Sequence, residues 1–108
     1  MTNQHDQTIV QNLLNNFGGQ RRLIAMIGAK HFSYDKTASK FSVSFRFPGS
    51  RKANYCEIWV NLGTDELGLQ LGKIRGTNFR IVKDYEEGLP NENVKRLFEQ
   101  ETGLYLSF

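Results

Sequence analysis

The residue types that carry out acid–base, nucleophilic or metal chemistry are few in this sequence and lie far apart. There are two histidines, His5 and His31, and one cysteine, Cys56. Neither histidine has a nucleophile or a carboxylate at a spacing that would build a proton relay. The chain has no His-x-x-x-His, no Cys-x-x-Cys and no aspartate-rich calcium loop, which are the usual metal-binding patterns. The sequence therefore predicts a protein without catalytic residues, cofactor or metal.

The cationic side chains are more informative, because they are distributed unevenly. Residues 1–38 hold four Lys and Arg against two acids, and residues 39–83 hold eight against three, a net charge of +5. Residues 84–108 hold two against six, a net charge of −4. A basic block of this kind is typical of a surface that meets nucleic acid or an acidic protein face. Lys and Arg also keep exposed strands soluble, so the block alone does not identify a partner.

The strongest candidate binding surface lies in residues 45–60, FRFPGSRKANYCEIWV. Arg51 and Lys52 lie in a turn between two runs that alternate apolar and polar residues, and Tyr55 and Trp59 share the polar parity of the second run. Tyr, Trp and Arg anchor many protein interfaces, and aromatic rings among cations also stack on nucleic-acid bases. The predicted partner-binding residues are Arg46, Arg51, Lys52, Tyr55, Trp59, Lys73 and Arg75.

The segment GKIRGTN supplies Lys73 and Arg75 and is only loosely similar to a phosphate loop. It lacks the Walker spacing and the Lys-Ser/Thr pair that ends that motif. No strongly helical segment follows it, so no helix N-terminus is aimed at an anion. The sequence instead favours a basic hairpin turn or bulge, in which Gly72 and Gly76 adopt unusual backbone angles.

Strand patterns occupy the middle of the chain and must position these residues. KFSVSFRF alternates four apolar residues with Ser42, Ser44 and Arg46, and Pro48-Gly49 ends it. NYCEIWVNL, ELGLQLGKI and NFRIVKDY continue the pattern as three further strands. Because the turns between them are short, we expect an antiparallel meander with one face on a core and the other in water.

Helical patterns lie on both sides of the strands. TIVQNLLNNFGG repeats apolar residues at helical spacing over 10–17 and predicts a helix that a Gly-Gly pair ends. QRRLIAMIGAKHF fits a helix and a strand, and its small residues favour a short helix that ends near Gly28. The stripe of Val94, Leu97 and Phe98 predicts a last helix, with Asn91 as its N-cap and Gly103 at its end.

Together these elements predict an α+β fold in which an antiparallel sheet of about four strands packs with two or three helices, as a single pair of layers. The 108 residues suit one domain, 1–108, with one core. The lone Cys56 within an apolar alternation predicts a buried, inert thiol and a reducing compartment. No apolar run is long enough for a signal sequence or a membrane span, so the expected location is the cytoplasm.

A resemblance to a known family rests on three segments, GGQRRLIAMIGAKHF, SFRFPGSRKANYCEIWVN with LGKIRGTNFRIV, and VKRLFEQETGLYLSF. In this order and at these separations, they resemble a widespread family of small, functionally uncharacterised proteins encoded by tailed bacteriophages and prophages. The resemblance covers roughly Gly18 to Phe108. It implies a phage or mobile-element origin, no enzymatic motif and no assigned site residues. Small phage proteins include inhibitors of host defence, anti-CRISPR proteins among them.

Two functions of different classes follow from the sequence. The first is a non-catalytic phage-type binding protein that blocks a host protein or ribonucleoprotein complex, such as a defence complex, through the basic turn and the aromatic strand face. The second is a small nucleic-acid-binding accessory protein that uses the same residues on phosphates and bases. An enzyme is disfavoured, because no proton-transfer or nucleophilic group is placed for catalysis. The sequence does not reveal the oligomeric state.

Overall fold

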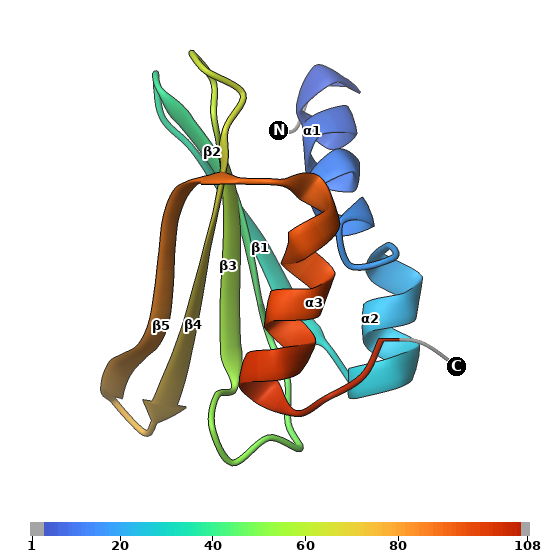
Figure 1. Cartoon of the computed structure of the whole chain (residues 1–108), viewed down its shortest axis with the longest axis vertical. Coiled ribbons are helices and arrows are strands. Elements are labelled where there is room, and N and C mark those ends of the chain that lie inside the picture. The colour runs from blue at the N-terminus through green and yellow to red at the C-terminus, as the bar shows by residue number, and fades with distance from the viewer. Residues whose placement is uncertain (1–3, 107–108) are drawn as a thin grey trace.

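The protein folds into a sheet that helices cover on one face. The computed structural model describes residues 4–106, without the side chains of residues 4, 5, 86 and 87. Within this part, the helices are α1 (Gln4–Asn15), α2 (Gln20–Ile27) and α3 (Asn91–Thr102), and the strands are β1 (Lys30–Lys36), β2 (Lys40–Arg46), β3 (Tyr55–Asn61), β4 (Leu67–Arg75) and β5 (Asn78–Leu89). All three helices lie on the same side of the sheet (Figure 1). The α+β class is confirmed.

The sheet has the order β1-β2-β3-β4-β5, and each neighbouring pair is antiparallel. The predicted antiparallel meander is therefore confirmed. The sequence predicted about four strands, and the sheet has five. The added strand is β1, whose residues are all exposed except the partly buried Phe32. Only Phe32 and Tyr34 alternate with polar residues in it, and this pattern is too short to predict a strand with assurance. Among the described residues it pairs with β2 alone, and its register is irregular between Lys30 and Ser33.

The helix ends lie close to the predicted positions. Helix α2 stops at Gly28, which has a left-handed φ of 68° and donates its N–H to the Ile24 carbonyl, so the helical alternative for this segment is confirmed. Helix α3 ends at Gly103 with φ of 75°. The N-cap of α3 is Pro90 and not Asn91. The fixed φ of proline already separates β5 from the helix there, so Asn91 becomes the first helical residue.

The core lies between the helices and the sheet, and three phenylalanine rings link its parts. Phe17 follows α1, Phe45 is on β2 and Phe98 is on α3, and all three are fully buried. The Phe17 ring lies edge-on to both of the others, with centroid distances of 5.6 Å to Phe45 and 5.5 Å to Phe98. Cys56 is also fully buried, as the alternation in β3 predicts.

Trp59 is buried although it projects from the opposite face of the sheet, where no helix of residues 4–106 lies (Figure 1). Only 7% of its surface is exposed. Gly68 on β4 pairs with it, and a Cβ placed on Gly68 would come within 2.2 Å of the indole ring. The Lys40 ammonium lies 4.3 Å from the centroid of the ring. The ring therefore lies in a slot that a glycine leaves open, beneath a lysine.

We expect Gly68→Ala to lower the free energy of unfolding by about 1–3 kcal/mol, as overpacking does, because the methyl group would collide with Trp59. Gly72→Ala is the matched control on the same strand. Its methyl group would meet the ring of Phe79 and approach the Arg80 carbonyl, but the Phe79 ring is 49% exposed and shifts at a lower cost than the buried Trp59 ring. Denaturant unfolding followed by the emission of the single tryptophan compares the two variants. Equal destabilisation would contradict the confinement of Trp59.

The buried thiol of Cys56 makes stability depend on pH. Desolvation, with the charge of Glu57 as a smaller cause, raises the pKa of Cys56 well above its ordinary value. The folded chain therefore keeps the proton at pH values where the unfolded chain loses it. This contribution to stability is fully present below the pKa of an unfolded thiol, about 8.5, and it is lost as the pH rises above that value.

We expect the free energy of unfolding to fall above a pH of about 8.5, by up to about 1.4 kcal/mol per pH unit for this one group. In Cys56→Ala the slope between about pH 8.5 and pH 10 should flatten, even though the smaller side chain lowers stability at every pH. Urea unfolding at a series of pH values measures both slopes. A slope that is the same in the two proteins would contradict the assignment to Cys56.

Candidate functional site

One end of the sheet collects cations from segments that are far apart in the sequence. In an antiparallel meander, the start of β1, the end of β2, the start of β3, the end of β4 and the start of β5 all lie at the same end, which is the lower end in Figure 1. The loop between β2 and β3 lies there too (Figure 1). The basic residues of this region, here called the basic end, are Lys30, Arg46, Arg51, Lys52, Lys73, Arg75 and Arg80.

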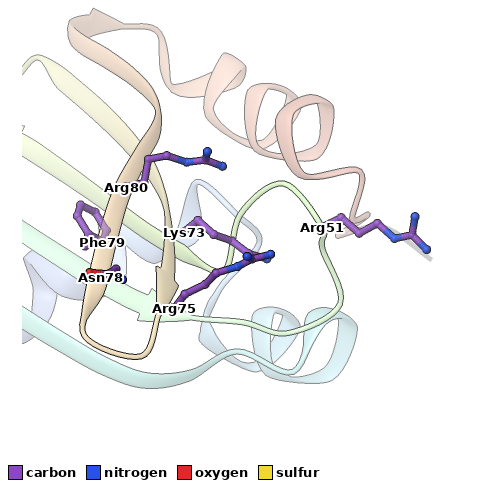
Figure 2. A pocket seen from close by; sticks show the side chains of 6 residues that line it. All are labelled: Arg51, Lys73, Arg75, Asn78, Phe79 and Arg80. Carbon is purple, nitrogen blue, oxygen red and sulfur yellow. The ribbon is translucent and has the colours of Figure 1, made fainter.

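A hollow of about 310 Å³ lies in the basic end and is called here the basic hollow (Figure 2). The side chains of Lys73, Arg75 and Arg80 extend from the β4–β5 hairpin to one side, and the β2–β3 loop carries Arg51 on that side (Figure 2). Among the described residues that line it, none has a carboxylate; they are Arg51, Lys73, Arg75, Asn78, Phe79 and Arg80. Four cations without a lining carboxylate give this hollow a positive potential, which makes it a candidate site for an anion.

The carboxylates at the nearby end of α3 are occupied elsewhere. Glu99 accepts a hydrogen bond of 2.7 Å from the Leu106 N–H, and Glu101 accepts one of 3.0 Å from the Tyr85 hydroxyl. Burial, together with this bond to Glu101, raises the pKa of Tyr85. Neither glutamate lines the basic hollow, so neither one neutralises its cations by direct contact there.

The register of the β4–β5 hairpin brings the cations of the hollow together. Lys73 pairs with Arg80, and Arg75 pairs with Asn78. Paired residues of an antiparallel ladder project to the same face, so the two strands place two cations side by side. The hairpin turns at Gly76, which has a left-handed φ of 59°, and the register shifts at Gly72. The predicted basic hairpin is therefore confirmed for the turn at Gly76, whereas Gly72 marks the register shift without a left-handed φ.

The loop that carries Arg51 is held in place by polar contacts. The Asn54 side chain donates to the Ile74 carbonyl (2.8 Å) and accepts from the Ile74 N–H (2.7 Å), which ties the loop to β4. The Ser50 hydroxyl donates to the Thr102 carbonyl at the end of α3 (2.8 Å). The Lys73 ammonium donates to the Ser50 carbonyl (3.2 Å). A loop with this many fixed points loses little conformational freedom when a ligand binds.

A second hollow of about 330 Å³ adjoins the first, because Lys73 lines both. Lys30 and His31 from β1 and Arg46 from β2 supply its other ionisable groups. His31 has a left-handed φ of 57°, an uncommon backbone angle for a residue with a side chain. The cationic surface thus continues from the β4–β5 hairpin past the loop to the start of β1.

The structure brings six of the seven predicted partner-binding residues to the basic end. These are Arg46, Arg51, Lys52, Tyr55, Lys73 and Arg75. Tyr55 is partly buried, and its ring lies edge-on to that of Phe79 at a centroid distance of 5.4 Å. Burial is the main cause that raises the pKa of Tyr55. Trp59 lies farther along β3 in its slot, and a ring that is 7% exposed offers a partner little contact area.

Ten residues that line the two hollows were not in the predicted set. Five of them belong to the candidate segment 45–60, and they are Phe47, Pro48, Gly49, Ser50 and Asn54. The other five lie outside that segment, and they are Lys30, His31, Asn78, Phe79 and Arg80. A turn placed at Gly76-Thr77 would have paired Lys73 with Arg80, so a signal for the hairpin residues was present. The signal for Lys30 and His31 is weaker, since β1 alternates only two aromatic residues, Phe32 and Tyr34, with polar ones.

Comparisons of the chain with protein-family models, with curated proteins and with solved structures find no match. No helix within residues 4–106 is both long and apolar enough to span a bilayer. In the same part of the chain, no three or more His, Cys, Asp or Glu side chains are grouped so that they would hold a metal ion.

Retention on immobilised heparin, a sulfated polyanion, tests whether the basic hollow is the anion site. We expect Arg51→Ala and Arg75→Ala to elute at lower salt than the wild-type protein, because each loses one cation of the hollow. Lys52→Ala is the matched control, since Lys52 neighbours Arg51 in the same loop but does not line either hollow. It should elute close to the wild type. An equal shift for all three variants would show that net charge alone sets retention.

Proposed function

We propose that this protein is a non-catalytic binding protein whose basic end binds the phosphate backbone of nucleic acid. The observation that carries the proposal is the basic hollow, in which two strands and a loop contribute Arg51, Lys73, Arg75 and Arg80. Arginine presents a planar fork of N–H donors that matches phosphate oxygens, and lysine adds a point charge. The adjoining hollow at Lys30 and Arg46 lengthens the cationic track, as a polymeric anion requires.

The two functions that the sequence leaves open make different demands on this surface. A stable protein interface has a desolvated centre with aromatic anchors and a charged rim. Of the two predicted anchors, Trp59 is buried and Tyr55 is partly covered. Phosphate binding needs only cations and N–H donors, and these dominate the basic end. The geometry therefore supports the nucleic-acid function better than blockade of a protein surface.

Binding to phosphates must weaken steeply with salt, because each contact releases counterions. We expect the protein to bind labelled DNA or RNA oligonucleotides at roughly 50 mM salt and to lose most of this affinity by roughly 200 mM. In the double variant Arg75→Ala with Arg80→Ala, the slope of log affinity against log salt should shrink by about 1.4 for a single strand or about 1.8 for a duplex. Fluorescence anisotropy measures the affinities and their slopes.

Arg21→Ala is the control for this experiment, because Arg21 is an exposed arginine on α2 that lines neither hollow. Its slope should stay near the wild-type value. Absence of binding at low salt, or the same slope for the double variant and the wild type, would overturn the proposal.

A second candidate function is supported by the exposed apolar side chains beside the basic hollow. Phe79 is 49% exposed and Ile81 is 52% exposed, and both lie on β5. They make an apolar patch, and Arg75 and Arg80 project from the opposite face of the same hairpin, across its edge, so an acidic protein that covers the edge could contact both. This arrangement, with the phage resemblance, supports an inhibitor that occupies a host defence complex in the host cytoplasm. Such a complex would weaken less with salt, and Ile81→Ala would cost it more than Arg75→Ala.

A further inference from the structure

We infer that the nucleic acid is single-stranded where it meets the basic end, and that Phe79 stacks on one of its bases. This inference rests on the nucleic-acid binding proposed above. It goes further because it specifies the form of the ligand and names a base-contacting residue outside the predicted set. Phe79 replaces Trp59 as the stacking residue, because the Trp59 ring is buried and the Phe79 ring is half exposed.

The first observation is the position of Phe79 relative to the cations. Phe79 lines the same hollow as the cations. It pairs with Ile74, whereas Arg80 pairs with Lys73, so the ring and these two cations project to opposite faces of the hairpin. In Figure 2 the ring of Phe79 lies on one side of β5 and the side chain of Arg80 extends on the other. A ligand that contacts both must therefore carry an anionic and an aromatic part.

The second observation is that β5 is an edge strand. Among the described residues it pairs with β4 alone, so no neighbouring strand blocks a ligand that crosses from the cationic face to the aromatic face. A flexible polymer with one phosphate and one base in each unit has the required chemistry. It can place a phosphate against Lys73 and Arg80 and turn a base over the edge onto Phe79.

The third observation is that the ring of Phe79 is held in position. One side packs on Gly72, where an added Cβ would lie only 2.5 Å from the ring. The Tyr55 ring meets it nearly perpendicularly, at 86°. An exposed phenylalanine is by itself ordinary on a protein surface. A half-exposed ring that packs on its neighbours and lines a cationic hollow is the arrangement with which proteins bind single strands, by stacking beside backbone contacts.

A duplex does not meet these requirements. Its base faces are stacked inside the helix, and a protein reaches one only by paying the energy to unstack or flip it. Single strands, loops and ends present base faces freely, and aromatic side chains stack on them with little dependence on sequence. The geometry therefore favours a single-stranded ligand of mixed sequence.

Three labelled oligonucleotides of equal length test the inference: a single strand, its duplex, and an abasic strand that keeps every phosphate. We expect the wild-type protein to bind the single strand more tightly than the other two. Phe79→Leu should weaken binding to the single strand roughly 5- to 150-fold, the range for the loss of one stacked base. It should leave binding to the abasic strand unchanged, and Phe79→Trp should keep the affinity for the single strand.

Tyr34→Leu is the matched control, because Tyr34 is 43% exposed and lies on β1, the opposite edge strand. It should bind all three oligonucleotides like the wild type. The emission of Trp59 and the unfolding midpoint verify that each variant is folded. A photocross-link from a 5-iodouracil oligonucleotide to the unsubstituted protein needs no variant, and we expect it on Phe79 or Tyr55. Cross-links confined to other residues would overturn the stacking role.

The outcomes separate this inference from the function on which it rests. Salt-sensitive binding of equal strength to all three oligonucleotides, unchanged by Phe79→Leu, would overturn the stacking role and leave the phosphate binding intact. Tighter binding to the duplex would overturn the preference for single strands. Absence of salt-sensitive binding to any of the three would overturn both proposals.

Discussion

The contact of Phe17 and Phe98 with Phe45 decides which face of the sheet is covered. The three rings come from three separate parts of the chain and are fully buried, and the burial of each is worth about 1.5–3 kcal/mol. With this contact made, α1 and α3 are fixed on the same side, and the opposite face stays without a helix among residues 4–106 (Figure 1). The position of the end of α3, and with it everything that hydrogen-bonds to that end, follows from this packing.

The basic end is connected to that core through hydrogen bonds. The Ser50 hydroxyl donates a hydrogen bond to the Thr102 carbonyl at the end of α3, and the Lys73 ammonium donates one to the Ser50 carbonyl. The side chain of Asn54 joins the same loop to Ile74 on β4. Cations held close together repel one another and weaken the folded state. The four cations around the hollow therefore cost stability in the free protein, and a bound anion would offset this repulsion.

Two glycines of β4 each leave room for an aromatic ring from a neighbouring strand, and the two rings differ in exposure. Gly68 leaves room for Trp59 from β3, and Gly72 leaves room for Phe79 from β5. Lys40 lies over the first ring, which is buried, while the second ring remains half exposed at the edge of the sheet. The first ring thus adds apolar burial to the face without helices, and the second supplies an aromatic surface next to the cations. The proposed base stacking and the second candidate function depend on that second surface, whereas phosphate binding depends on the cations.

Local patterns in the sequence determined the helices, the four strands from β2 to β5, the burial of Cys56 and the basic hairpin. These features depend on the parity or the helical face of a residue within its own segment, which the sequence contains. The resemblance to phage proteins remains a prediction. Only the tertiary structure decided that β1 joins the sheet, that Trp59 is buried and that Phe79 and Arg80 line one hollow with the other cations. Each of these depends on which residues lie opposite one another on neighbouring strands, and that register is a property of the assembled sheet.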